Sequence, residues 1–489
     1  KRIRCSQNFL VDKAAVYASE ATGMNISVGR ISLSFPLNLV VTNVDAASPH
    51  NDTLLSVRRL QVNVQLLPLL KKQVEVDGIS LQGATVNSND LIHGMKLNGT
   101  LGELFISSHG VALDPETAIV NKVLLKDTDL SLCLNDTAAA DTAASDTAYW
   151  KIILQDIDLQ NVSFALDMPL DSLSLAASLD NAILRDGLID LHKSAYSLQT
   201  FRIENGRVRY DNGKPLAADS LSSGLDPSHI ALTDIGVKLD SLYYGGRNMK
   251  AIISQFVLKE RSGVEIVSAT GRMVSNDKVL RVPSLKLETR DSYLELNAAM
   301  DWNALDFKDE GLVSARLMAD IGKPDVVRFM GSMDEKFIRQ YPSEPLRIRT
   351  GIDGDLNKLK LTTLTAELPG ALGLFARGEL THLTDSLLRG GDITLEAETK
   401  DLKFVSTLAE GIEIPYGTRL EGKFTMAGTK MGTDLLLMQP EAQAVVAADT
   451  IPITVYNDSI SVADDFKMER AARLFAKYDL SRDRYEADL

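Results

Sequence analysis

Apolar residues recur in pairs spaced by two in this chain, which is the spacing of side chains on one face of a β-strand. The stretch 74–86 and the stretch 152–164 share this pattern, with pairs at Val74/Val76, Ile79/Leu81 and Ala84/Val86 and at Ile152/Leu154, Ile157/Leu159 and Val162/Phe164. Between pairs the spacing is three, so one residue is inserted each time. An inserted residue turns the following side chains to the other face unless a tight turn or a bulge restores them. The pattern predicts short strands that keep one apolar face, with junctions at Asp77–Gly78 and Gln82–Gly83.

The second stretch begins 78 residues after the first (152 − 74 = 78), and a looser copy follows from Ile230 to Leu242. A fixed internal period is typical of solenoids and of other folds that rebuild one surface along the chain. We therefore expect three regions. Residues 1–73 form an N-terminal cap, residues 74–260 hold the repeated units with a low-complexity linker at 138–148, and residues 261–489 continue the same sheet.

Few segments show helical spacing. We expect an amphipathic helix at 6–22, a short helical plug at 66–72, a helix at 324–340 and a helix near 464–478, in which Phe466, Arg470, Leu474 and Tyr478 are four apart. The stretch 284–300 predicts a hairpin that turns at 290–292. Strands do not alternate with helices, so the predicted fold is mostly β, an elongated, curled antiparallel sheet that forms a groove.

Composition narrows the function classes. A net charge of −14 and an aromatic content of 6% argue against a nucleic-acid partner, which needs basic and stacking side chains. Two cysteines, Cys5 and Cys133, provide neither a metal-ligand spacing nor a disulfide framework. The chain has no apolar run of 18 residues or more, the length expected of a membrane-spanning helix.

No motif for enzymatic chemistry is present. The phosphate-binding loop, the nucleophile elbow and the helical zinc motif are all missing. The six histidines, at 50, 93, 109, 192, 229 and 382, form no ligand cluster, and we expect each at the surface or in a loop. The segment Asp353–Gly354–Asp355 lacks the rest of a calcium loop. We therefore expect a protein that is not an enzyme and has no cofactor or metal.

The repeated aliphatic residues must be covered on one side of the sheet. A closed sandwich would cover them with protein, whereas an open, curled sheet could cover them with lipid chains, at about 0.8 kcal/mol for each buried methylene. The pattern alone leaves both alternatives open.

The segment 58–86, in which strands lead into Leu66-Leu67-Pro68-Leu69 and then into a glycine-containing strand pair, resembles the N-terminal signature of the AsmA-like superfamily. The segment Thr22–Leu33 is similar to the opening of the same superfamily. The segments 341–349 and 367–370 resemble its TamB family, the translocation and assembly module subunits. The resemblance covers most of the chain.

The resemblance implies a periplasmic protein of a Gram-negative bacterium, anchored in the inner membrane by an N-terminal helix. It implies a β-sheet groove that carries phospholipid between the membranes and an outer-membrane barrel as partner. The anchor and the barrel-binding domain have no counterpart in this sequence, and its abrupt ends suggest a piece of something longer.

The resemblance makes a lipid conduit the leading hypothesis. Its acyl chains would lie on Val74, Val76, Ile79, Leu81, Val86, Ile152, Leu154, Ile157, Leu159 and Phe164. An assembly factor for outer-membrane barrels and a structural spacer with a filled core are the alternatives. The Asp-Thr dipeptides at 136, 141 and 146 are also similar to a bacterial O-glycosylation pattern, although turn chemistry explains them equally well.

Overall fold

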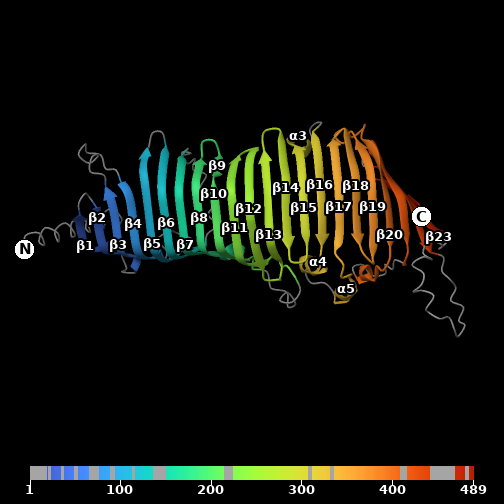
Figure 1. Ribbon diagram of the computed structural model, residues 1–489. Helices are drawn as coiled ribbons and strands as arrows, with labels where there is room; N and C mark the ends of the chain where they lie inside the picture. Colours follow the sequence, from blue (N-terminus) through green and yellow to red (C-terminus); the bar gives the residue numbers. More distant parts are fainter. Residues whose placement is uncertain are drawn as a thin grey trace, which may run out of the picture. The chain divides into compact units, whose positions relative to one another are not determined.

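The computed structural model describes residue 19 and residues 24–34, 38–48, 53–64, 76–88, 94–112, 116–135, 150–213, 224–306, 311–330, 335–407, 416–440, 468–479 and 484–488. The described chain is mostly β and mostly antiparallel, with few helices, which confirms the predicted fold class at that level. Figure 1 labels its strands and short helices. The chain forms two compact units, Lys1–Arg272 and Met273–Leu489. The predicted helix at 6–22 (apart from Ser19), the plug at 66–72 and the linker at 138–148 lie outside the described residues.

Unit 1 contains a sheet whose strands follow one another in chain order. The strands are β1 (Asn25–Ser34), β2 (Asn38–Ala47), β3 (Thr53–Val64), β4 (Val76–Asn87), β5 (Met95–Ala112), β6 (Thr117–Leu134), β7 (Lys151–Met168), β8 (Leu173–Asp190), β9 (Ala195–Leu198), β10 (Thr200–Asp211), β11 (His229–Gly245) and β12 (Asn248–Glu260). A 3-10 turn, η1 (Pro169–Asp171), joins β7 to β8. β9 and β10 lie end to end, since both pair with β8 and with β11.

One pair in unit 1 departs from the antiparallel pattern. β6 and β7 are parallel, and Thr117 is aligned with Lys151 and Cys133 with Asp167. The chain must therefore return from the end of β6 to the level at which β6 began. As a result, β7 runs in the same direction as β4, whereas β11 runs in the opposite direction. The third, looser copy of the sequence pattern lies on β11 and so crosses the sheet in reverse.

A row of left-handed residues crosses unit 1 at right angles to the strands. Its members have φ between 50° and 61° and lie on β2, β4, β6, β7, β10 and β11: Asn43, Gly83, Asp127, Asn161, Asn205 and Asp234. The pairs Lys126–Gln160 and Thr128–Val162 flank Asp127 and Asn161, which are left unpaired in the ladder. We call this row the αL row.

The residues of the αL row are the inserted residues that the spacing of three predicts. Gly83 separates Leu81 from Ala84, and these two residues still pair with Leu60 and Val57 of β3 without a change of register. The predicted short strands are therefore single strands of 12 to 18 residues, each with a bulge-like interruption. The junction at Asp77–Gly78 coincides with a register shift in the β3–β4 ladder.

Side chains support this row. The Asn161 amide Nδ2 donates to Asp127 Oδ1 at 2.9 Å, and the Asn205 amide donates to Asp180. Glycine occupies β5 at the same level because a Cβ on Gly102 would lie 2.8 Å from the Asp127 Cβ. A left-handed backbone costs most residues about 1–2 kcal/mol, but Asn and Asp adopt it readily.

Unit 2 contains antiparallel strands that pair in chain order. They are β14 (Val279–Thr289), β15 (Tyr293–Asp301), β16 (Leu312–Ile321), β17 (Leu346–Asp355), β18 (Lys358–Leu368), β19 (Leu372–Thr381), β20 (Gly390–Thr399), β21 (Arg419–Ala427), β22 (Lys430–Pro440), β23 (Met468–Asp479) and β24 (Arg484–Asp488). β13 (Glu265–Ser275) spans the boundary between the units. The hairpin predicted at 284–300 is confirmed as β14 and β15.

Short helices close both ends of the unit 2 strands. At one end, α4 (Lys323–Met330), α5 (Glu335–Gln340) and η2 (Lys403–Thr407) surround a cluster in which the Phe337 and Phe404 rings meet edge to face at 5.7 Å. At the other end, α3 (Trp302–Leu305) contributes Ala304 to a smaller cluster with Val313 and Leu356. The predicted helix at 324–340 is confirmed as α4 and α5.

The helix predicted near 464–478 is wrong. Residues 468–479 form strand β23, which pairs with β22. Residues four apart lie on one face of a helix, but four is also an even number, so they share one face of a strand. The spacing of Phe466, Arg470, Leu474 and Tyr478 therefore fits both elements, and pairing with β22 selects the strand.

The αL row leads to a stability prediction. Asn161→Val replaces a residue that tolerates φ of 51° with a β-branched one, and the free energy of unfolding should fall by about 1–2 kcal/mol. Asn161→Gly keeps the conformation and should cost less. Urea unfolding of both variants checks this, and equal losses would contradict a backbone origin.

A buried carboxylate gives a second stability prediction. Asp325, 1% exposed, accepts hydrogen bonds from the Thr289 hydroxyl and the Ser292 hydroxyl and pairs with Arg328 at 3.1 Å. It ties α4 to the β14–β15 turn, and Asp325→Ala should cost roughly 2–3 kcal/mol in the free energy of unfolding because it removes bonds to a charged group. Asp291→Ala removes only the half-exposed partner of Arg328 and should cost under about 1 kcal/mol. Thermal unfolding of both variants measures the two losses of stability.

Candidate functional site

The aliphatic residues of unit 1 line up in rows across the strands. Cross-strand partners share a face of a sheet, so each row can be followed from one ladder to the next. One row contains Ile79, Ile106, Val123, Ile157 and Leu184, and the next contains Leu81, Leu104, Leu125, Leu159 and Ala182. Both rows lie on the same face, which we call the aliphatic face.

The 78-residue period has a direct geometric meaning. Ile79 and Ile157 occupy the same row three strands apart, and so do Leu81 and Leu159. Val86 likewise shares a row with Phe164. The period is the length of chain that leads from β4 through β5 and β6 to a strand of the same direction and register.

The structure brings most of the predicted site residues together on the aliphatic face. Ile79 and Phe164 are each 38% exposed. The half-buried members are Leu81, Val86, Ile152, Leu154, Ile157 and Leu159. Val74 lies outside the described residues, and of Val76 only the backbone is described.

The opposite face of the same strands is more polar, although one of its rows contains Phe105, Leu124 and Ile183 beside Ser80 and Asp158. Arg185 forms ion pairs with Asp156 and Asp158, and Asn121 donates to Gln155 at 2.9 Å. The separation of the two faces depends on the αL row, because without it each strand would present polar residues to the aliphatic face beyond the row.

The aliphatic face of unit 1 has little packed core above it. Among the described residues of unit 1, the fully buried hydrophobic side chains are mostly small: Ala46, Leu54, Val57, Ala84, Ala182, Ala195, Val264 and Ala269. The larger aliphatic side chains of the rows keep part of their surface accessible. Exposed apolar area of this kind is unfavourable in water and marks a surface that another apolar group can cover.

Unit 2 repeats the arrangement with shorter strands. Leu364, Ala376, Leu395, Gly422 and Leu435 form one row. Along β21 the odd-numbered positions from Arg419 to Thr425 are exposed, whereas the even-numbered positions are half-buried. The two buried clusters of unit 2 lie at opposite ends of the strands. This row crosses the strands between the two ends.

The sequence analysis missed two strands between the two copies, β5 and β6, and the strand that follows the second copy, β8. β5, β6 and β8 contribute as many residues to the rows as β4 and β7 do, for example Leu104, Leu125 and Leu179. The signal was present, because Leu101/Leu104 and Leu179/Ala182 also show the spacing of three that flanks the αL row.

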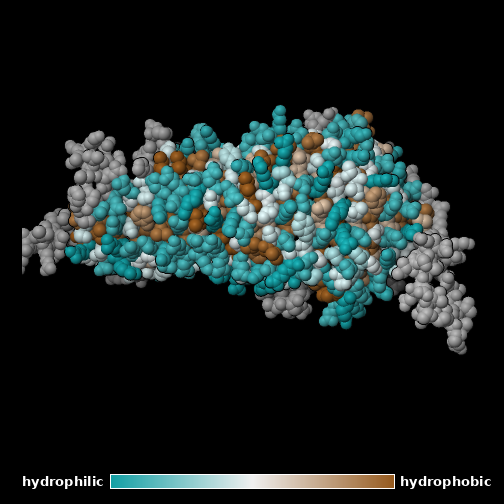
Figure 2. Space-filling model, in the orientation of Figure 1, coloured by the Kyte–Doolittle hydropathy of each residue, from teal (hydrophilic) through white to brown (hydrophobic). Residues whose placement is uncertain are grey.

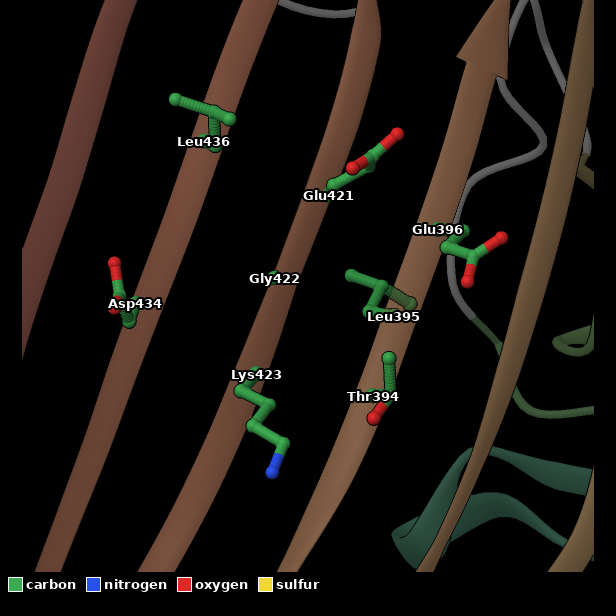
Figure 3. Close-up of a pocket in the computed structure, with 8 residues that line it drawn as sticks. All are labelled: Thr394, Leu395, Glu396, Glu421, Gly422, Lys423, Asp434 and Leu436. Carbon is green, nitrogen blue, oxygen red and sulfur yellow. The ribbon is translucent and has the colours of Figure 1, made fainter.

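Surface depressions lie on the strands of both units. In unit 1, a depression of about 360 Å³ includes Leu130, Phe164, Ala177, Val208 and Leu232, which share one row. In unit 2, a depression of about 540 Å³ spans β20 to β22 (Figure 3) and is lined by Thr394, Leu395, Glu396, Glu421, Gly422, Lys423, Asp434 and Leu436. Its Lys423 pairs with Asp392 at 3.1 Å. The charged side chains that line this second depression are typical of a surface in contact with water.

One histidine departs from expectation. His229 was expected at the surface or in a loop, but its side chain is 5% exposed. Its Nδ1 lies 2.8 Å from Asp226 Oδ2, and its Nε2 lies 3.6 Å from Asp211 Oδ1. Both ring nitrogens face carboxylates, which suits an anchor for the start of β11. The hydrogen bond from His229, followed by that from the Ser228 amide, lowers the pKa of Asp226.

Among the residues that the structure describes, no cluster of three or more His, Cys, Asp and Glu side chains is placed to bind a metal ion. Within the same residues, no helix combines the length and the apolar character needed to cross a membrane. Cys133 is a free, half-buried thiol. Comparison of the chain with protein-family models, curated proteins and solved structures finds no match.

The Asp226 contact predicts a pH dependence. A carboxyl whose pKa is lowered on folding stabilises the fold above its unfolded value of 3.8, and this stabilisation is lost as pH falls through the lowered folded value. Asp226→Asn should therefore lower the unfolding midpoint at pH 7, and the difference from the unmodified protein should shrink in acid. Asp171→Asn, at an exposed position in η1, is the control and should behave like the unmodified protein.

Proposed function

We propose that the protein is a non-enzymatic lipid carrier whose aliphatic faces bind the acyl chains of phospholipids. The observation that supports this most directly is the series of aliphatic rows that remain half-exposed across strand after strand. Acyl chains are flexible and need no shaped polar pocket, so a continuous aliphatic surface can bind them in many positions. Each buried methylene contributes about 0.8 kcal/mol.

The polar groups of the lipid would lie at the strand ends in this proposal. The aliphatic face offers them few partners, and an unpaired charge among apolar side chains is costly. In this proposal the sheet acts as a groove for lipid. The acyl chains lie along the rows, and the headgroups lie at the margin of the sheet.

The resemblance to the AsmA-like superfamily supports a cellular setting for this activity. In that setting the protein acts in the periplasm of a Gram-negative bacterium, carries phospholipid between the inner and outer membranes, and cooperates with an outer-membrane barrel. The half-exposed rows favour this proposal over a spacer with a filled core. Assembly of outer-membrane proteins is the other alternative, through pairing with an open strand edge.

A charge on the aliphatic face tests the proposal. Ile157→Asp should reduce phospholipid extracted from the purified protein at least about fivefold, because the carboxylate would be buried against acyl chains. Gln160→Asp introduces the same charge at an exposed position that belongs to the polar rows of β7, and it should leave bound lipid unchanged. Mass spectrometry of the extracts measures both.

Circular dichroism of both variants checks that the sheet is intact. Unchanged lipid content in a folded Ile157→Asp protein would refute lipid binding by this face. Capture of unfolded barrel strands by a preparation that contains no lipid would instead favour the assembly factor.

A further inference from the structure

The connection between β19 and β20 holds two neighbouring leucines in solvent. Leu387 is 78% exposed and Leu388 is 65% exposed. Both belong to unit 2 and lie at the strand ends, away from the rows of the aliphatic face. Single exposed leucines are common on protein surfaces, but an adjacent pair at a loop tip is an apolar projection.

Hydrogen bonds fix the shape of this loop. Asp385 Oδ1 accepts from the Leu387 amide at 2.8 Å and from the Leu388 amide at 3.1 Å. The Arg389 side chain donates through Nε to the Gly428 carbonyl at 2.8 Å, and the Gly428 amide donates to the Arg389 carbonyl at 2.7 Å. At the other end of the loop, Leu383 packs against the buried cluster of α3. The loop is therefore tied to the β21–β22 turn and to the core, and the two leucines are held outward.

Further leucines are exposed at the same end of the strands. Leu305, at the end of α3, is 42% exposed, and Leu312, at the start of β16, is 47% exposed. These positions and the loop lie where β15 and β19 end and where β16 and β20 begin. We call Leu305, Leu312, Leu387 and Leu388 the leucine edge. Figure 2 shows apolar surface at the strand ends near β18 and β19.

The size and charge of the projection indicate what it contacts. Leu387 and Leu388, exposed to 78% and 65%, offer far less area than the roughly 800 Å² per partner of a stable protein interface. A lipid bilayer accepts isolated leucines because hydrophobic burial is non-directional and needs no complementary pocket. Thr384 and Ser386 in the loop are uncharged, and the Asp385 carboxylate already accepts backbone hydrogen bonds.

We propose that the leucine edge is a membrane-docking element, in which Leu387 and Leu388 insert into the interfacial region of a phospholipid bilayer. The net charge of −14 selects an electrically neutral lipid surface, because an anionic one repels the protein at low salt. Docking at this edge does not require lipid on the aliphatic face.

Co-flotation with phosphatidylcholine vesicles tests the proposal on the full chain. Leu387→Ser combined with Leu388→Ser should lower the vesicle-bound fraction about tenfold. The matched control is Phe329→Ser combined with Met330→Ser, which removes residues 56% and 47% exposed from the other end of the strands and should leave flotation unchanged. Phosphatidylglycerol in the vesicles should weaken binding at low salt, and added salt should restore it.

Three outcomes would overturn the proposal. They are an unmodified protein that does not float, equal binding by the unmodified and leucine-edge variants, and equal losses in both double variants. Concentration-dependent self-association that depends on Leu387 and Leu388 would assign the edge to a second copy of the chain. Extracted lipid should be unchanged in the leucine-edge variant, and flotation should be unchanged in Ile157→Asp, so this proposal and the proposed function can fail separately.

Discussion

The strict alternation of side chains along a β-strand is the constraint on which unit 1 depends. A single inserted residue would move all later aliphatic side chains to the wrong face. The αL row prevents this by placing left-handed residues at one level of β2, β4, β6, β7, β10 and β11. On β3, β5 and β8 the residue at the same level is left unpaired in the ladder, so the phase changes together across the sheet. Neighbouring ladders then keep their register, as Leu81 with Leu60 and Leu159 with Ala182 illustrate. One largely aliphatic face and one more polar face extend across the sheet as a result.

Unit 2 is stabilised differently from unit 1. Its strands are mostly 9 to 12 residues long, and short helices close their ends with buried clusters around Phe337 and around Ala304. Stability is thereby concentrated at the ends, where side chains pack as in an ordinary protein core. The middle rows are free of this packing role and can serve as a binding surface. The proposed docking through one strand end and the proposed acyl-chain binding on the face therefore involve separate residues.

Local patterns predicted several elements well. The β-rich antiparallel character, the 284–300 hairpin and the helices near 324–340 follow from spacing and turn residues that depend only on nearby sequence. The prediction near 464–478 failed because a spacing of four is compatible with a helix and with a strand. Propensity was the only remaining guide there, and pairing with β22 outweighed it.

The sequence by itself determined which residues are aliphatic, at which spacing, and where the extra residue falls, because these are properties of single strands. Only the tertiary structure decided which strands are neighbours. The parallel pairing of β6 with β7 places Ile157 in the row of Ile79, whereas the reversed direction of β11 separates the third copy from the first two. It also decided that Leu387 is held in solvent while Leu383, four residues earlier, packs against a buried cluster. Strand order, direction and exposure depend on contacts between distant residues, and those contacts leave no local pattern to read.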